Sequence, residues 1–204
     1  RARREAQRVV LHRLARDPAV VVAAHLDHPL HRLGACRRGD ARTERRGPFQ
    51  AKIGSGLSVE AFNTRMAQGR MGHVGLPESM GMLFEALGRR LAHYETTVEP
   101  VLADKPVRTE FFAVAPGQVR GLKQVARGYS DAGEFATLTF YAALGAEEDG
   151  DSIKITGKPD LEVSLKGANG DLATVAIAVN AIRGVVGAEP GLLTMLDIPL
   201  LRRW

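Results

Sequence analysis

Cysteine is nearly absent from this sequence, since Cys36 is the single one among 204 residues. One thiol can form neither an internal disulfide nor a zinc site built from several cysteines, and it is typical of proteins from a reducing compartment. No apolar run reaches the roughly 18 residues that a membrane span requires, and no signal-peptide core follows the Arg-rich start. We therefore expect a cytoplasmic globular chain without a membrane partner.

Several catalytic and nucleotide-binding motifs are missing as well. The dinucleotide fingerprint G-x-G-x-x-G and the P-loop pattern G-x-x-x-x-G-K-[ST] occur nowhere in the chain. A G-x-S-x-G nucleophile elbow is also absent. The residues therefore predict neither a dinucleotide site nor a serine triad within these 204 positions.

Lysine is missing from residues 1–50, which contain twelve arginines and five acidic residues and so carry a net charge of +7. Residues 51–204 hold sixteen basic and eighteen acidic residues, a net of −2. Surfaces that bind nucleic acid combine basic and aromatic residues on a folded face, but no aromatic residue precedes Phe49. We expect no nucleic-acid partner, and binding through a basic arm remains only a third hypothesis.

Residues 1–46 form the first of two expected segments, an atypical Arg-rich one. Four of the six histidines lie there, a bias that a GC-rich gene produces when it is read in a shifted frame. A disordered basic arm is the other interpretation. Residues 5–16 can form a helix, and VVVAAHL (20–26) can form a short buried strand.

The segment HLDHPLH resembles a set of metal ligands. It places four candidate side chains within seven residues: His25, Asp27, His28 and His31. Pro29 breaks the helix that would bring the last two together. We therefore assign no metal site.

Residues 47–204 form the second expected segment and show regular patterns. Ser58 predicts the cap of a helix with apolar residues at helical spacing, and a second helix is predicted over 77–91, with Pro77 first and Met80, Leu83, Phe84 and Leu87 as its stripe. Strand-like segments with turn signals between them follow at 94–103, 109–115, 118–129, 134–145, 151–157 and 159–167. A helix over 171–187 is apolar almost all round, and we expect it to be buried against the sheet. The pattern predicts an α+β fold, with an open, mainly antiparallel sheet and helices packed on one face.

The stretch GHVGLPESM (72–80) contains a histidine between two glycines, just ahead of a predicted helix. Histidine can exchange a proton near neutral pH, and glycine lets a backbone approach a ligand closely. Lys52, His73 and Glu78 are therefore the best titratable candidates, although a purely structural turn remains open. The glycine-rich segments 54–56 and 167–174 precede helices and could hold an anion, or Asp171 could simply cap its helix.

Several long segments resemble one family. They are RRGPFQAKIGSGLSVEAF, GRMGHVGLPESMGMLFEALG, ETTVEPVLA, GQVRGLKQVARGY and KGANGDLATVAIAVNAIRGVVGAEPGLLTMLDIPL. In this order they are similar to the C-terminal domain of 2,4-diaminopentanoate dehydrogenases and of related dihydrodipicolinate reductase-like dehydrogenases, over residues of about 45–200.

The resemblance implies an NAD(P)-dependent oxidoreductase acting on a small amino or imino acid, of which this chain is the substrate-binding and oligomerisation domain. An N-terminal Rossmann domain would bind NAD or NADP in the intact enzyme, so we expect this chain alone to be inactive and not to bind the cofactor. The implied catalytic residues are His73, Glu78 and Lys52, and the implied substrate-binding residues are Gln50, Asn169, Gly170, Asp171 and Thr174. A homo-oligomer through the sheet is also implied. The alternative is a ligand-binding or assembly domain that keeps the fold without redox activity.

Overall fold

A computed structural model describes residues 21–29, 42–146, 150–157, 159–166 and 170–198, with the backbone alone for 21–29, 42–46 and 170–172. The chain divides into two compact units, residues 1–166 and 167–204. The first unit contains β1 (Val21–Pro29), α2 (Arg42–Lys52), α3 (Val59–Ala67), α4 (Leu76–Ala86), β2 (His93–Leu102), β3 (Val107–Arg108), β4 (Ala113–Val114), β5 (Val119–Ser130), β6 (Gly133–Ala143), β7 (Gly150–Thr156) and β8 (Leu161–Lys166). The second unit contains α5 (Gly170–Val186). The segment boundary that we expected at residue 46 stays a prediction.

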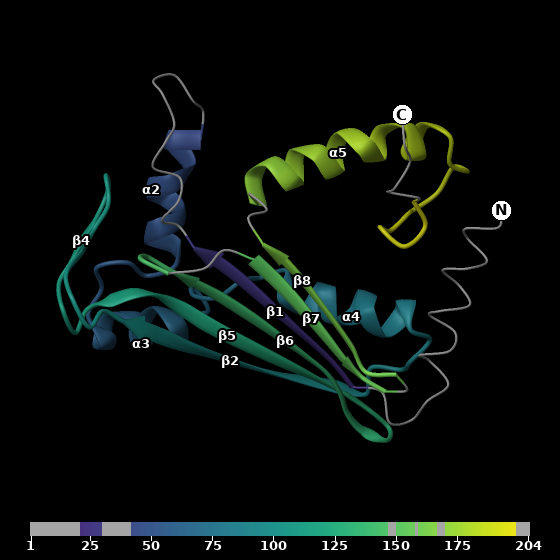
Figure 1. The fold of residues 1–204 in the computed structure, drawn as a ribbon, viewed down its shortest axis with the longest axis horizontal. Coiled ribbons are helices and arrows are strands. Elements are labelled where there is room, and N and C mark those ends of the chain that lie inside the picture. The colour runs from purple at the N-terminus through teal and green to yellow at the C-terminus, as the bar shows by residue number, and fades with distance from the viewer. Residues whose placement is uncertain (1–20, 30–41, 147–149, 158, 167–169, 199–204) are drawn as a thin grey trace. The chain divides into compact units, whose positions relative to one another are not determined.

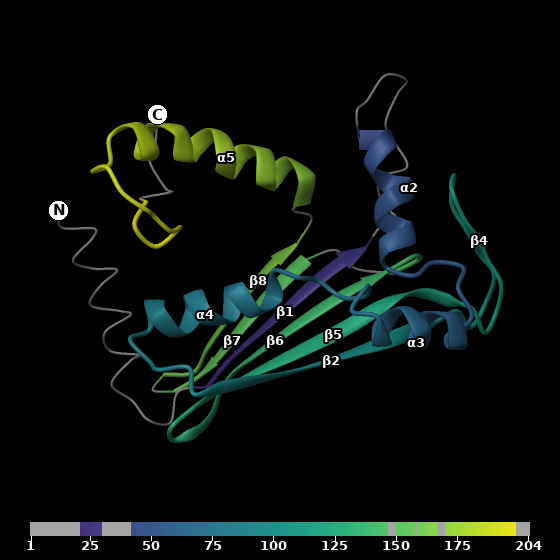
Figure 2. The same cartoon turned by 180° about the vertical axis from the view of Figure 1, so that it is seen from behind.

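Six strands form one open sheet in the order β2-β5-β6-β1-β7-β8, while β3 and β4 pair separately. β1 runs parallel to β6, and the other neighbouring strands are antiparallel. Helices α3 and α4 lie on the same face of the large sheet (Figures 1 and 2). The predicted fold class, an α+β fold with an open and mainly antiparallel sheet, is confirmed. The strand expected at residues 20–26 is present as β1.

Strand β5 shows why the helices cover one face only. Its residues alternate between buried positions, such as Leu122 and Ala126, and exposed ones, such as Lys123 and Arg127. Because successive side chains of a strand point to opposite faces, the buried set defines the face that the helices cover. At Gly128 a Cβ would lie 2.5 Å from Sδ of Met80 and 2.6 Å from the ring of Phe84 on α4, so α4 packs directly on the backbone of β5.

Helix α4 has the predicted apolar stripe, because Met80, Phe84 and Leu87 are buried and Leu83 is partly buried against them. It ends at Ala86, five residues earlier than predicted. Gly88 adopts a positive φ of 62°. The Gly88 N–H donates to the carbonyl of Glu85, and the Arg89 N–H donates to the carbonyl of Phe84. This pattern is a Schellman motif, which satisfies the last carbonyls and stops the helix.

Helix α3 begins as its sequence predicts. The hydroxyl of Ser58 accepts the N–H of Ala61 at 3.2 Å, which is the N-cap bond expected of serine at this position. Phe62 on α3 is fully buried. It belongs to a core cluster that joins the turn after α2 to strands β5 and β6, with members Ile53, Phe62, Ala103, Val107, Val114, Val119, Leu122, Ala142 and Leu144.

The strand predicted over 109–115 was wrong over most of its length. The Thr109 hydroxyl accepts the backbone N–H groups of Phe111 (3.2 Å) and Phe112 (3.0 Å). A side chain that takes up these donors offers the backbone an alternative to a strand ladder. The segment therefore turns, and only the two-residue strands β3 and β4 remain beside the turn.

Helix α2 was not predicted, because Pro48 and Gly47 lie inside it and both residues disfavour a helix interior. The helix predicted over residues 5–16 lies outside the described residues. None of the helices in the part of the chain that the structure describes is long and apolar enough to cross a membrane.

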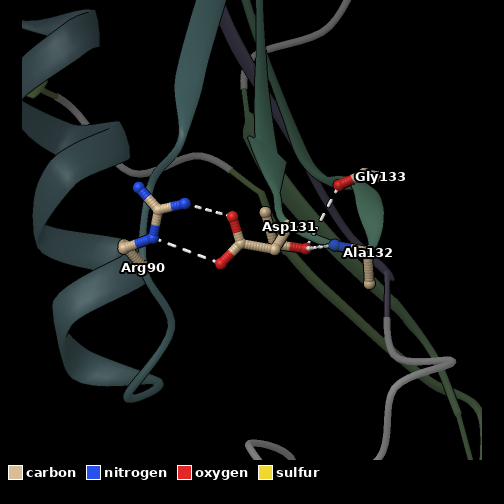
Figure 3. A network of polar contacts seen from close by, with 5 residues as sticks. Arg90, Asp131, Ala132 and Gly133 are labelled. Atoms are coloured by element: carbon tan, nitrogen blue, oxygen red, sulfur yellow. Dashed lines mark hydrogen bonds and ion pairs between the residues drawn. The ribbon is translucent and has the colours of Figure 1, made fainter.

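The hairpin between β5 and β6 is tied to the loop that follows α4 (Figure 3). Nε of Arg90 donates to Oδ2 of Asp131 at 3.2 Å, and Nη2 donates to Oδ1. The hydrogen bond and the negative charge of Asp131 raise the pKa of Arg90. Within the hairpin, Oγ of Ser130 donates to the carbonyl of Gly133 and accepts the N–H of Ala132. Both ends of the ion pair are exposed, so it orients the hairpin more than it stabilises the fold.

In the second unit, α5 begins one residue before the predicted start and ends one residue before the predicted end. Its apolar side chains are exposed, at 60% for Val175, 57% for Ile182 and 52% for Val185. Burial of α5 against the sheet of the first unit stays a prediction. Because apolar residues occupy every face of this helix, one packed face would still leave several of them uncovered.

Candidate functional site

His73 lies in the loop between α3 and α4, where both its backbone and its ring are held. Its backbone N–H donates to Oε1 of Gln124 at 2.6 Å, and its ring nitrogen Nδ1 accepts the N–H of Gly75 at 3.2 Å. The ring centre lies 4.9 Å from that of Phe140 at an interplanar angle of 53°. The residue is nevertheless exposed. Exposed side chains ordinarily keep their rotamer freedom, whereas these contacts restrict the orientation of the His73 ring.

Each of the two glycines beside His73 makes one of these contacts possible. Gly72 has a φ of +101°, and a Cβ there would lie 3.1 Å from Oε1 of Gln124 and 3.3 Å from Cγ2 of Val98. Glycine therefore lets the chain approach the carboxamide. Gly75 has an ordinary φ of −82°, but a Cβ there would lie 3.0 Å from Cε1 of His73. The second glycine thus leaves room for the ring to fold back onto the backbone.

The two ring nitrogens of His73 differ in their contacts. Because Nδ1 accepts the Gly75 N–H, the proton of the neutral ring lies on Nε2. Among the described residues, Nε2 makes no hydrogen bond. The neutral ring therefore presents a hydrogen-bond donor, whereas transfer of a proton to a ligand requires the imidazolium form, which is protonated on both nitrogens and returns to the neutral ring.

Lys52 is the last residue of α2 and is exposed. Its side chain forms no hydrogen bond or ion pair with any residue that the structure describes. The turn that follows Lys52 nevertheless approaches the loop of His73, because a Cβ on Gly54 would lie 3.1 Å from Cε of Met71. The structure thus brings these two segments to the same core cluster.

Glu78 lies in the first turn of α4 and is exposed. Within the described residues it forms no hydrogen bond or ion pair, so no contact joins it to His73 or Lys52. A carboxylate at this position is favoured by the positive end of the helix dipole. The site therefore has a fixed histidine, together with a lysine and a glutamate whose side chains the described contacts leave unrestrained.

Gln50 is buried, with 3% of its surface exposed. Its Oε1 accepts the hydroxyl of Thr109 at 2.8 Å. This contact ties α2 to the turn between β3 and β4. The structure therefore gives Gln50 a packing contact beside the substrate-binding role that we predicted.

The other predicted substrate residues belong to the second unit. Asn169 lies outside the described residues. Gly170 is the first residue of α5 and Asp171 the second, so Asp171 occupies the first turn rather than the cap position that we considered. Thr174 is exposed.

No group of three or more His, Cys, Asp or Glu residues that could hold a metal ion is found in the part of the chain that the structure describes. The backbone of His25, Asp27 and His28 belongs to β1, but their side chains and His31 lie outside the described set. The one parallel pair among the described strands is β1–β6, whereas a dinucleotide fold is built on a mostly parallel sheet.

A second group of titratable side chains lies on the ends of β2 and β5, and sequence reasoning did not single it out. His93 and Tyr129 face each other in the ladder and stack at 4.5 Å, and the Tyr129 hydroxyl donates to Oε2 of Glu95 at 3.4 Å. Loss of solvent and the charge of Glu95 raise the pKa of Tyr129. The phenol therefore stays protonated at neutral pH.

Two residues of the His73 site were also missed, namely Gln124 and Phe140. The signal for Gln124 was present, because it interrupts the apolar stripe formed by Leu122 and Ala126 on β5. Phe140 gave no comparable signal, since an aromatic residue in a strand is ordinarily part of the core.

Comparisons with known proteins agree with this architecture. Residues 46–204 match the family described as the 2,4-diaminopentanoate dehydrogenase C-terminal domain. The chain is 32% identical over 156 residues to 2,4-diaminopentanoate dehydrogenase from Acetoanaerobium sticklandii, an alignment that covers 73% of this chain and 44% of that protein. The structure of an amine dehydrogenase from Mycobacterium smegmatis is similar in fold, with a TM-score of 0.67 at 21% identity, over 90% of this chain and 52% of that one. The chain thus spans about half the length of these relatives.

Proposed function

Because this chain belongs to the family of 2,4-diaminopentanoate dehydrogenase C-terminal domains, we propose that it is the substrate domain of an NAD(P)-dependent oxidoreductase. The match over residues 46–204 is the observation that carries the proposal. The proposed substrate is a small amino or imino acid. The name of the relative from Acetoanaerobium sticklandii supports a substrate that bears an amino group.

His73 is the proposed catalytic residue of this domain. Its Nε2 lies across the ring from Nδ1, which accepts the Gly75 N–H. The neutral ring can donate a hydrogen bond from Nε2 to a bound substrate, and the imidazolium form can transfer the Nε2 proton to it and return to the neutral ring. Lys52 at the end of α2 and Glu78 in the first turn of α4 are both exposed. They are proposed to bind groups of opposite charge on the substrate, since an amino acid carries both signs.

The nicotinamide would supply the redox chemistry in the intact enzyme. The described residues do not fit this cofactor, because the sequence contains no G-x-G-x-x-G motif and the sheet is mainly antiparallel. We therefore propose that these 204 residues do not bind NADH or NADPH by themselves and do not turn over substrate alone. No cofactor residue is assigned to this chain.

We also propose that the domain forms a homo-oligomer through its sheet in the cytoplasm. Helices α3 and α4 cover one face of the sheet (Figures 1 and 2), and the opposite face is the one proposed to pack against a partner subunit. The single cysteine fits a reducing compartment. A molar mass of one chain in dilute solution, measured by light scattering, would contradict the oligomer.

The alternative is a ligand-binding or assembly domain with the same fold and no redox role. Isothermal titration of this chain with NADH and NADPH tests the cofactor claim, because we expect no heat of binding at micromolar concentrations. Micromolar binding would overturn it. Turnover of an enzyme that joins this domain to a nucleotide-binding domain separates the two functions, since the alternative predicts none.

A further inference from the structure

Gln124 is a polar residue at a buried position of β5, with 5% of its surface exposed. Both ends of its carboxamide are bonded. Oε1 accepts the backbone N–H of His73 at 2.6 Å, and Nε2 donates to the hydroxyl of Thr96 on β2 at 3.2 Å. An amide that is buried without partners is costly, so these bonds fix the carboxamide in one orientation.

The neighbour of Gln124 in the sheet completes the contact. Phe140 on β6 faces Gln124 directly in the ladder, and its ring contacts the ring of His73. Two adjacent residues of neighbouring strands therefore hold the same histidine. Gln124 holds its backbone and Phe140 holds its ring, both from the face of the sheet that α4 covers.

The loop that contains Gly72 and His73 lies close to Gln124. Gly72 has a positive φ, and any Cβ there would lie 3.1 Å from Oε1 of Gln124. Val98, which faces Gln124 on the other side in β2, would lie 3.3 Å from the same Cβ. The hydrogen bond between Gln124 and His73 thus depends on a glycine at position 72.

We infer that Gln124 is a positioning residue for His73, acting through the His73 backbone N–H so that the ring rests on Phe140 and presents Nε2–H. The inference rests on the proposed function of His73. Gln124 itself is not proposed to contact the substrate. Its bond fixes where the loop leaves the sheet, and the Gly75 N–H then fixes the rotation of the ring.

The direct test is the state of the His73 ring in the chain itself. Gln124→Met keeps the length and bulk of the side chain but removes the acceptor. In nuclear magnetic resonance spectra, we expect the unaltered chain to show contacts between the His73 and Phe140 ring protons and one neutral form protonated on Nε2. In Gln124→Met we expect the contacts to be lost and the second tautomer to appear.

Thr96→Val is the matched control, because it removes the acceptor of Nε2 and leaves the bond to His73 in place. We expect its His73 spectrum to match that of the unaltered chain. If Gln124→Met does not fold by circular dichroism, Gly72→Ala tests the same bond from the loop side and should produce the same ring signature. A folded Gln124→Met or Gly72→Ala chain with unchanged His73 signals would overturn the inference.

Kinetics separate positioning from general stability. In an enzyme that contains this domain and a nucleotide-binding domain, Gln124→Met should lower kcat on the order of 10-fold with little change in KM, because small displacements of a reacting group are costly. In a His73→Ala background the same substitution should have no further effect. An equal loss in both backgrounds would show that Gln124 does not act through His73. If His73→Ala leaves turnover unchanged, the proposed function of His73 fails, whereas the spectra still decide whether Gln124 positions the ring.

Discussion

Alanine substitutions at the two glycines beside His73 should separate the stability of the fold from the geometry of the site. Gly72 has a φ of +101°, and an L-residue in this region costs about 1–2 kcal/mol. The added Cβ also lies 3.1 Å from Oε1 of Gln124. We therefore expect Gly72→Ala to lower the free energy of unfolding by about 2 kcal/mol, which corresponds to a Tm lowered by roughly 4–8 °C for a chain of this size.

Gly75→Ala should behave differently. The φ of −82° and ψ of −4° at Gly75 are allowed for alanine, and the weaker helix cap of alanine is offset by its smaller entropy in the unfolded chain. We expect a stability change within about 0.5 kcal/mol. The new Cβ would lie 3.0 Å from Cε1 of His73, so the ring must move, and the bond from the Gly75 N–H to Nδ1 lengthens.

Urea denaturation and the His73 ring signals measure the two effects separately. We expect Gly72→Ala to be the less stable variant and to alter the His73 ring signals as well, whereas Gly75→Ala keeps its stability and alters the ring signals alone. A Gly75→Ala chain that is destabilised more than Gly72→Ala would refute the assigned roles. A Gly75→Ala chain with unchanged His73 ring signals would also refute the assigned roles.

Four further predictions concern the frame around the site. Gly128→Ala should cost about 1–3 kcal/mol by overpacking, and adding Met80→Ala should cost less than the sum of the two single changes, as measured by urea denaturation, because the side chain that the new Cβ meets is removed. Ser58→Ala should cost about 1 kcal/mol through the lost cap. The pKa of Glu60 is lowered by its own backbone N–H and by the Ser58 hydroxyl, so this stabilisation is present above the unfolded-state pKa of the carboxyl group and is lost as the pH falls through the folded-state one. Thermal melts of Glu60→Gln should therefore differ from those of the unaltered chain at neutral pH and converge with them in acid. Asp131→Asn, which removes the ion pair of Figure 3, should change the Tm by less than about 2 °C and even less at high salt.

The fold could be predicted where local pattern and tertiary packing agree. The sequence displays the helical spacing of Met80 and Phe84 and the alternation along β5. It also displays the residue preference that makes Ser58 a helix cap. The end of α4 was misplaced although Gly88 stood at the position that a helix stop favours. The strand predicted near Thr109 was wrong because a hydroxyl took its backbone donors, which no apolar period reveals.

The site could be predicted only in part from the sequence. The flanking glycines marked His73, but their separate roles depend on contacts with Gln124 and with the ring itself. Gln124 lies 51 positions away in the sequence. A hydrogen bond over that separation follows from the sheet register and from the path of the loop, and neither has a local signature. For Gln50, the family-like segment predicted a substrate-binding residue. In the structure its side chain is buried and accepts a hydrogen bond from Thr109.

The proposed role of His73 is tested by the turnover of His73→Ala in an enzyme that contains this domain and a nucleotide-binding domain. If His73 donates a proton to the substrate, kcat should fall by about 100-fold, while the Tm stays within about 2 °C because the ring is exposed. Unchanged kinetics together with a lowered Tm would make His73 a structural residue and contradict the account.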